Sequence, residues 1–93
     1  MTKPEQLARI FNVLSSETRV RMVDLLKRRP LCVNALAQAL EITPAAVSQH
    51  LRILRNEDIV TAEKRGYFVH YRINEGTLAK WRGAAEVLLK GKT

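Results

Sequence analysis

The sequence contains very little cysteine, glycine or proline, and each shortage excludes a class of protein. One cysteine among 93 residues excludes an internal disulfide and favours a reducing compartment. Four glycines and three prolines exclude a collagen-like or low-complexity chain. No apolar run approaches the length that spans a bilayer, and residues 1–5 lack the apolar segment of a secretory signal. We therefore expect one globular, cytoplasmic domain over residues 1–93.

Acidic residues are also scarce relative to basic ones. Nine Asp and Glu stand against sixteen Lys and Arg, which leaves a formal net charge of +7. The excess is spread along the chain and forms no polybasic tail, so we assign it to the folded surface. A positive surface favours a polyanionic partner, most often nucleic acid, although solubility or a membrane surface would also explain it.

The first thirty residues show the spacing of two amphipathic helices. The first is expected to begin near Pro4, with an apolar face made by Leu7, Ile10, Phe11 and Leu14. Ser15 and Ser16 interrupt it, and either serine is suited to cap a second helix that ends in cations before Pro30. The residues that we expect this second helix to bury are Val20, Met22, Val23 and Leu26.

Two shorter helices are predicted next, joined by a tight turn at Glu41 and Ile42. We expect Asn34 to cap the first, whose apolar face is Leu36, Ala37 and Leu40. Thr43 followed by Pro44 is a strong start signal for the second. That helix is expected to end between Asn56 and Asp58 and to bury Val47, Leu51 and Leu54. Two short helices joined in this way predict a helix-turn-helix.

The apolar period then changes from helical to alternating. Residues 59–64 and 67–73 are predicted to form two strands around a turn at Arg65 and Gly66, which makes a hairpin. Asn74 is suited to cap a final helix along which Leu78, Trp81, Ala85 and Leu88 align, and residues 91–93 are expected to fray. The predicted fold class is therefore α+β and mostly α: a winged helix-turn-helix whose wing is the hairpin.

The second helix of a helix-turn-helix enters the DNA major groove, and its N-terminal residues reach the base edges. The candidate DNA-contacting residues on this helix are Thr43, Ala45, Ser48, Gln49, His50 and Arg52. Lys64, Arg65 and Tyr67, around the hairpin tip, are candidates for contacts with phosphates or a minor groove. Ordinary solvated polar residues are the alternative at each of these positions.

The two histidines and the cysteine form no recognisable catalytic or metal-binding motif. His50 and His70 have no Cys, His or Asp at ligand spacing, and the chain has no nucleophile elbow, phosphate loop or HExxH sequence. We therefore expect no enzyme, no metal and no cofactor. Cys32 is expected to be a packing residue, with a redox-sensing thiol as the alternative.

Residues 48–54, SQHLRIL, resemble the S-x-H-L-x-x-L recognition-helix signature of the ArsR/SmtB family of winged-helix repressors. Residues 16–26 and 65–73 are similar to the second helix and the wing of that family. The resemblance implies a homodimeric transcriptional repressor that binds an imperfect DNA palindrome and, in many members, releases it when an effector binds. It also implies a dimer interface on the first and last helices, to which we assign Leu7, Ile10, Phe11, Leu14, Leu78, Trp81, Ala85 and Leu88.

Both metal sites known in that family are broken in this chain. Cys32 matches the first residue of the family's Cys-x-Cys site, but Asn34 replaces the second cysteine, and no His follows His70 for the site on the last helix. We expect an effector that is not a metal at these sites. Asp58 stands where the family often has Gly, and we expect it to tolerate a left-handed backbone. A winged-helix module that binds protein or RNA is the alternative function, and an unrecognised enzyme is a weaker one.

Overall fold

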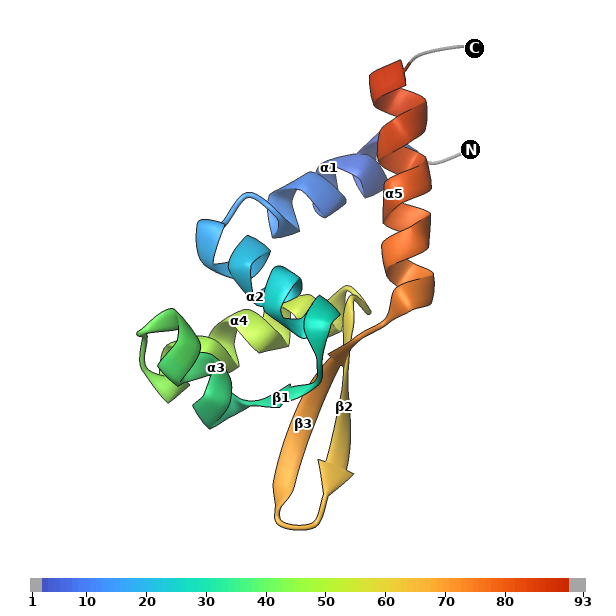
Figure 1. Cartoon of the computed structure of the whole chain (residues 1–93). Helices are drawn as coiled ribbons and strands as arrows, with labels where there is room; N and C mark the ends of the chain where they lie inside the picture. Colours follow the sequence, from blue (N-terminus) through green and yellow to red (C-terminus); the bar gives the residue numbers. More distant parts are fainter. Residues whose placement is uncertain (1–2, 91–93) are drawn as a thin grey trace.

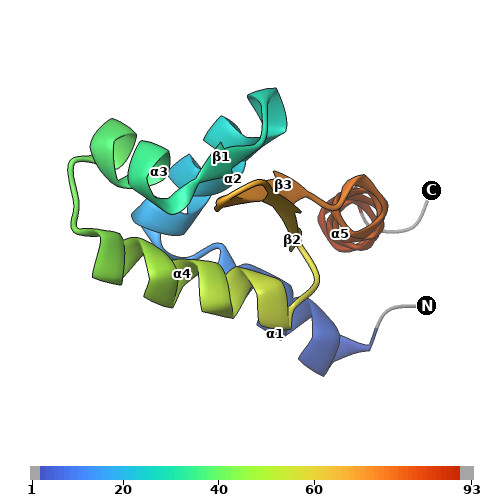
Figure 2. The same cartoon turned by 90° about the horizontal axis from the view of Figure 1, so that it is seen from below.

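The computed structural model describes residues 3–90 (Figure 1). Residues 91–93, which we expected to fray, lie outside this range. Within it, the elements follow one another as α1 (Pro4–Val13), α2 (Glu17–Arg28), β1 (Leu31–Cys32), α3 (Val33–Leu40), α4 (Pro44–Asn56), β2 (Val60–Arg65), β3 (Phe68–Ile73) and α5 (Glu75–Lys90). The helices α3 and α4 lie on one side of the hairpin and α5 lies on the other (Figures 1 and 2). The predicted α+β winged helix-turn-helix is confirmed.

Side-chain caps fix where three of the helices begin. Ser16 accepts a hydrogen bond from the backbone N–H of Arg19 at 3.2 Å, and Thr43 accepts one from Ala46 at 3.1 Å. The Oδ1 atom of Asn74 accepts one from Thr77 at 3.3 Å. Each bond satisfies an N–H group that has no partner inside its helix, so the predicted starts of α2, α4 and α5 are confirmed.

The predicted cap at Asn34 is wrong. Helix α3 begins at Val33, and Cys32 is its N-cap residue, without a hydrogen bond from the side chain. The reason is strand β1, which the sequence did not predict and which runs directly into α3. A strand of two residues is too short to show an alternating pattern.

The three strands form an antiparallel sheet in the order β1-β3-β2. Leu31 pairs with Tyr71 and Cys32 with His70, while β2 and β3 pair from the root of the hairpin to its tip. The predicted turn is shifted by one residue, to Gly66 and Tyr67. Gly66 has φ +62°, which glycine adopts without strain and which a type II′ turn needs at its first position. Tyr67 therefore lies in the turn, 100% exposed, and not in the strand over residues 67–73 that we expected.

The core is formed by the predicted apolar faces of α2, α3 and α4 with the root of the hairpin. Its largest fully buried side chains are Met22, Leu36, Val47, Leu51, Leu54, Ile59 and Val60. The prediction that Val20 is buried is wrong, because its side chain is 46% exposed. At 100° per residue, Val20 lies about 120° around the helix from the buried Leu26, beyond the edge of the core-facing stripe.

The turn that joins α4 to β2 has the backbone conformation we expected. Asp58 has φ +60°, in the left-handed region that a glycine adopts most easily and that Asp tolerates better than most residues. The N–H of the next residue, Ile59, donates to Leu54 in the last turn of α4, and Ile59 is fully buried. The turn therefore connects α4 directly to β2, the first strand of the wing, while the residues that follow it stay buried in the core.

The first half of the last helix packs against the core, and its end extends away from the fold. Leu78 and Trp81 pack against the core and Ala84 is buried, whereas Val87, Leu88 and Leu89 are 67, 53 and 76% exposed. Figure 1 shows the far end of α5 extending beyond the rest of the chain. None of the described helices is long and apolar enough to cross a membrane.

Candidate nucleic-acid interface

Helix α4 buries one face and presents the opposite face to solvent. Val47, Leu51 and Leu54 are buried, as the spacing predicted. Five of the six predicted contact residues on this segment are exposed, namely Thr43, Ala45, Ser48, Gln49 and Arg52. The helix carries no acidic residue. Its exposed face therefore offers small side chains, neutral hydrogen-bonding groups and cations, which is the chemistry that base edges and phosphates require.

An open cleft of about 350 Å³ separates α4 from β3 and includes a residue that our sequence analysis missed. Its lining consists of Ser48, Leu51, Arg52, Arg55, Asn56 and Tyr71. Arg55 was missed although it shares a helix face with Ser48 and Arg52, at the spacing i, i+4, i+7. Within residues 3–90, no ion pair engages Arg52 or Arg55. Both guanidinium groups are therefore available to an anion.

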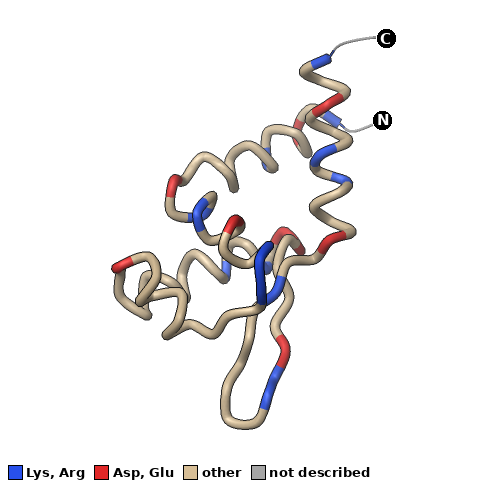
Figure 3. The backbone as a smooth tube through the Cα atoms, viewed as in Figure 1, with Lys and Arg blue, Asp and Glu red and all other residues tan. Residues whose placement is uncertain are grey.

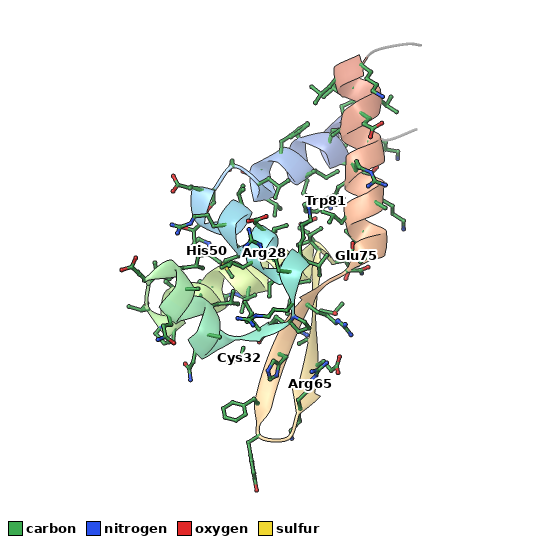
Figure 4. All side chains as sticks on the ribbon, in the orientation of Figure 1. Arg28, Cys32, His50, Arg65, Glu75 and Trp81 are labelled. Atoms are coloured by element: carbon green, nitrogen blue, oxygen red, sulfur yellow. The ribbon has the colours of Figure 1, made fainter. Side chains whose placement is uncertain are left out.

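His50 differs from the other candidates on α4 because it is half-buried and faces α2 (Figure 4). Its Nδ1 atom lies 3.3 Å from a guanidinium nitrogen of Arg19. Burial of the ring, and then the positive charge of Arg19, lower the pKa of His50. One edge of the imidazole is thus engaged inside the protein, and His50 has less freedom to contact DNA than its neighbour Gln49.

The charges of the wing partly neutralise one another. The Glu63 carboxylate accepts hydrogen bonds from Arg65 and from Arg72, each at 3.2 Å. Figure 3 shows acidic and basic residues following one another along β2. Lys64, between Glu63 and Arg65 in the sequence of that strand, takes part in no ion pair within the described residues. Phe68, next to the exposed Tyr67, is also exposed and was not among the predicted contacts. The tip of the wing is therefore aromatic with cations beside it.

Cys32 is a free, half-buried thiol at the edge of the sheet. Its strand partner His70 has a buried Nδ1 atom without a hydrogen-bond partner. Among residues 3–90, no three Cys, His, Asp or Glu side chains are grouped so that they could hold a metal ion. That the protein senses no metal at the family's usual positions stays a prediction.

The structure divides the residues assigned to the dimer interface into three groups. Leu14, Leu78 and Trp81 pack against the core of the protomer. Phe11 and Leu88 are exposed, and Leu7, Ile10 and Ala85 are half-buried. The exposed Val87 and Leu89 were missed. Val87 lies on the opposite side of α5 from the predicted apolar stripe, whereas Leu89 continues that stripe, four residues after Ala85.

The fold and this surface define a winged helix-turn-helix protein, and comparisons with known proteins identify its family. Residues 16–62 match the family described as bacterial regulatory protein, arsR family. The chain belongs to the ArsR family, as the resemblance predicted. This is a family of regulatory proteins and not of enzymes, so the expectation that the chain is not an enzyme is confirmed as well.

Individual relatives agree with this assignment. The chain is 36% identical to a transcriptional repressor SmtB homologue of Synechocystis over 78% of its own length, but it covers 55% of that relative. An ArsR-like transcriptional regulator from Rhodococcus sp. RHA1 has a similar structure, with a TM-score of 0.80 and 30% identity over 90% of this chain and 79% of that one. The homodimeric winged helix-turn-helix DNA-binding domain of a possible ArsR-family regulator from Mycobacterium bovis is 26% identical, with a TM-score of 0.74 over 96% and 83% of the two chains.

Proposed function

We propose that this protein is a cytoplasmic, sequence-specific transcriptional repressor that binds an imperfect DNA palindrome as a homodimer. The observation that carries the proposal is the exposed face of α4. This face has no carboxylate, includes two arginines that form no ion pair among residues 3–90, and borders an open cleft beside the wing. An α-helix fits the major groove of B-DNA, and this is the helix that the fold leaves free to enter it.

The helix and the wing are proposed to make different kinds of contact. Ser48 and Gln49 would read base edges, because a glutamine amide pairs with adenine through two hydrogen bonds. The methyl groups of Thr43 and Ala45 suit the methyl group of thymine. Arg52 and Arg55 line the cleft, where a phosphate would meet both guanidinium groups.

The wing would follow the DNA backbone next to the half-site that α4 reads. Lys64 offers a cation without a partner among residues 3–90, and Arg65 would exchange Glu63 for a phosphate. Tyr67 is fully exposed at the tip, where its ring can enter a minor groove. These contacts would add affinity for any DNA sequence, because phosphates are the same along the duplex.

A homodimer would place two copies of α4 on two half-sites related by a two-fold axis. The exposed apolar residues Phe11 on α1 and Val87, Leu88 and Leu89 on α5 provide a surface for it. The homodimeric neighbour from Mycobacterium bovis supports this arrangement. We further propose that the effector is not a metal held by the Cys32 segment or by the last helix, since each lacks the family's ligands.

Selection of bound duplexes from a random pool at physiological salt tests the proposal. We expect enrichment of an imperfect palindrome, and a changed base preference at particular positions when the selection is repeated with Gln49→Ala. Gln6→Ala, the same substitution on α1, is the matched control and should leave the preference unchanged. Enrichment of no duplex sequence, with binding of RNA or of a protein instead, would support the alternative module.

A further inference from the structure

Arg19, in the first turn of α2, joins three helices at one point. Its Nε atom donates to the carbonyl of Val13 at 2.7 Å and its Nη2 atom donates to the carbonyl of Asn12 at 3.3 Å, both at the end of α1. Its Nη1 atom lies 3.3 Å from Nδ1 of His50 on α4. One half-buried guanidinium therefore connects the end of α1 to the middle of the recognition helix.

The contacts with α1 satisfy a helix end that has no cation of its own. The last carbonyl groups of a helix have no partner within it, and the helix dipole makes that end favourable for positive charge. The last turn of α1 contains no basic residue. Arg19 supplies the missing charge from the next helix, and Val13, whose carbonyl it binds, is itself buried in the core.

The contact with α4 defines the state of His50. A guanidinium has donors only, so Nδ1 of His50 must be the acceptor and the ring hydrogen must lie on Nε2. Burial and the charge of Arg19 lower the pKa of His50, which keeps the ring neutral near neutral pH. A protonated ring would lose the bond, because Nδ1 would carry a hydrogen, and it would place a second positive charge beside Arg19.

We propose that Arg19 is a positioning residue for DNA recognition, which holds α4 against the end of α1 through a neutral His50. The inference rests on the proposed DNA-binding function. His50 is the direct neighbour of Gln49, so the bond fixes the part of α4 that is proposed to read bases. Since α1 carries part of the proposed dimer surface, the same link sets the recognition helix relative to the dimer.

Acid should therefore weaken specific DNA binding through His50. Arg19 is the charged group that faces His50 from α2, and α3 carries no titratable side chain. The charged residues of β2, Glu63, Lys64 and Arg65, lie toward the tip of the wing. If His50 instead contacted a phosphate directly, its protonation would strengthen binding. The two roles predict opposite signs for the effect of pH.

The first test measures affinity for the selected palindrome by fluorescence anisotropy between about pH 7.5 and pH 5.5, where histidine titrates. Wild type should bind about fivefold to tenfold more weakly at the lower pH, which is the net contribution of about one hydrogen bond. His50→Asn places an acceptor that does not titrate near the position of Nδ1, so it should bind like wild type at neutral pH and show little decline. His70→Asn, which changes the other histidine, should keep the full decline.

The second test separates the geometry of Arg19 from its charge. Arg19→Lys keeps the charge, but one ammonium group cannot serve carbonyls on α1 and an imidazole on α4 as a planar fork does. It should weaken specific binding and affect random duplexes much less, whereas Arg21→Lys, at an exposed position two residues further on, should change neither. In a double-mutant cycle, Arg19→Lys and His50→Ala should be strongly non-additive, because either change breaks the same bond.

The outcomes separate this inference from the proposed function. Binding of wild type to no specific sequence would overturn the proposed function. Specific binding that rises in acid would overturn the proposed role of Arg19 and leave the proposed function standing. An equal decline in wild type and in His50→Asn would do the same. A histidine titration by NMR tests the contact between Arg19 and His50 in the absence of DNA. The pKa of His50 should rise in Arg19→Met, and an unchanged pKa would contradict the contact.

Discussion

The Arg65 guanidinium donates to the Glu63 carboxylate at 3.2 Å, so a wing cation proposed to meet DNA is paired with an acidic group of its own strand. The same carboxylate also holds Arg72. All three side chains are about half exposed to solvent, and ion pairs of this kind contribute about 0–1 kcal/mol to stability. Their main effect is therefore on how strongly the wing attracts phosphates.

Removing that carboxylate should strengthen DNA binding. Glu63→Gln frees Arg65 and Arg72, so affinity should rise for every duplex sequence, and the salt dependence should steepen by up to about two phosphate contacts per protomer. The free energy of unfolding should change by less than about 1 kcal/mol. Anisotropy titrations at several salt concentrations measure the affinity and the slope of its logarithm against the logarithm of the salt concentration.

Asp24→Asn is the matched control for Glu63→Gln. Asp24 forms an exposed ion pair with Arg28 on α2, so its removal changes the net charge equally at a different place. It should alter binding less than Glu63→Gln does. An equal gain from both variants would mean that net charge, and not the wing, sets the affinity.

Gln49 and Arg55 should differ in what they contribute to binding. Gln49→Ala should cost about 1–3 kcal/mol per half-site at particular base pairs and leave other sequences unaffected, since a bidentate amide contact is specific to one base. Arg55→Ala should weaken all sequences nearly equally and reduce the salt slope by about one contact per protomer. Titrations with single-base variants of the palindrome distinguish the two patterns, and identical behaviour would refute this division of roles.

The exposed end of α5 should hold the dimer together. Leu88→Glu places a charge on a side chain that is 53% exposed in the protomer, so the fold should remain while the dimer dissociates. Light scattering should give twice 10.6 kDa for wild type and 10.6 kDa for the variant. Tyr67→Glu, at the tip of the wing, is the control and should remain dimeric. A wild-type monomer at micromolar concentration would contradict the proposal.

Cys32 should be dispensable for the stability of the protein. As the N-cap residue of α3 it makes no capping hydrogen bond, whereas a serine hydroxyl at that position can accept one from the first turn. Cys32→Ser should therefore stabilise the protein by about 0.5–1 kcal/mol in thermal or urea unfolding. A large loss of stability would show that packing of the thiol outweighs the cap.

Zinc, cadmium and arsenite at micromolar concentration should leave the affinity for the palindrome unchanged. The Cys32 segment supplies one thiolate, and three or four ligands are needed for these ions. Release of DNA by a metal would overturn this reading. Release by peroxide in wild type but not in Cys32→Ser would instead identify the thiol as a redox sensor.

Most of the fold follows from local signals that the sequence carries openly. Thr43 before Pro44 marks the start of α4, and the apolar spacing of α3 and α4 marks their buried faces. Asp58 takes the left-handed conformation that we expected it to tolerate. These features depend on residues close together in the chain, so a single sequence is enough to predict them.

The features that were missed depend on contacts between distant segments. Strand β1 forms because Leu31 and Cys32 meet β3, and two residues have no pattern of their own. The role of Arg19 requires the end of α1 and His50 on α4 to converge on one guanidinium. Val20 is exposed because the core covers a narrower stripe of α2 than its apolar residues suggest.

Protection of guanine N7 atoms from dimethyl sulfate tests the central claim most directly, because N7 lies in the major groove and α4 is proposed to occupy it. On the selected palindrome, the wild-type protein should protect two clusters of guanines, one in each half-site. Their centres should lie about one helical turn, roughly 10 base pairs, or a multiple of it apart. Gln49→Ala should weaken this protection within both half-sites, whereas Glu63→Gln should not. Protection of a single cluster, or binding without any N7 protection, would contradict a dimer that reads the major groove with α4.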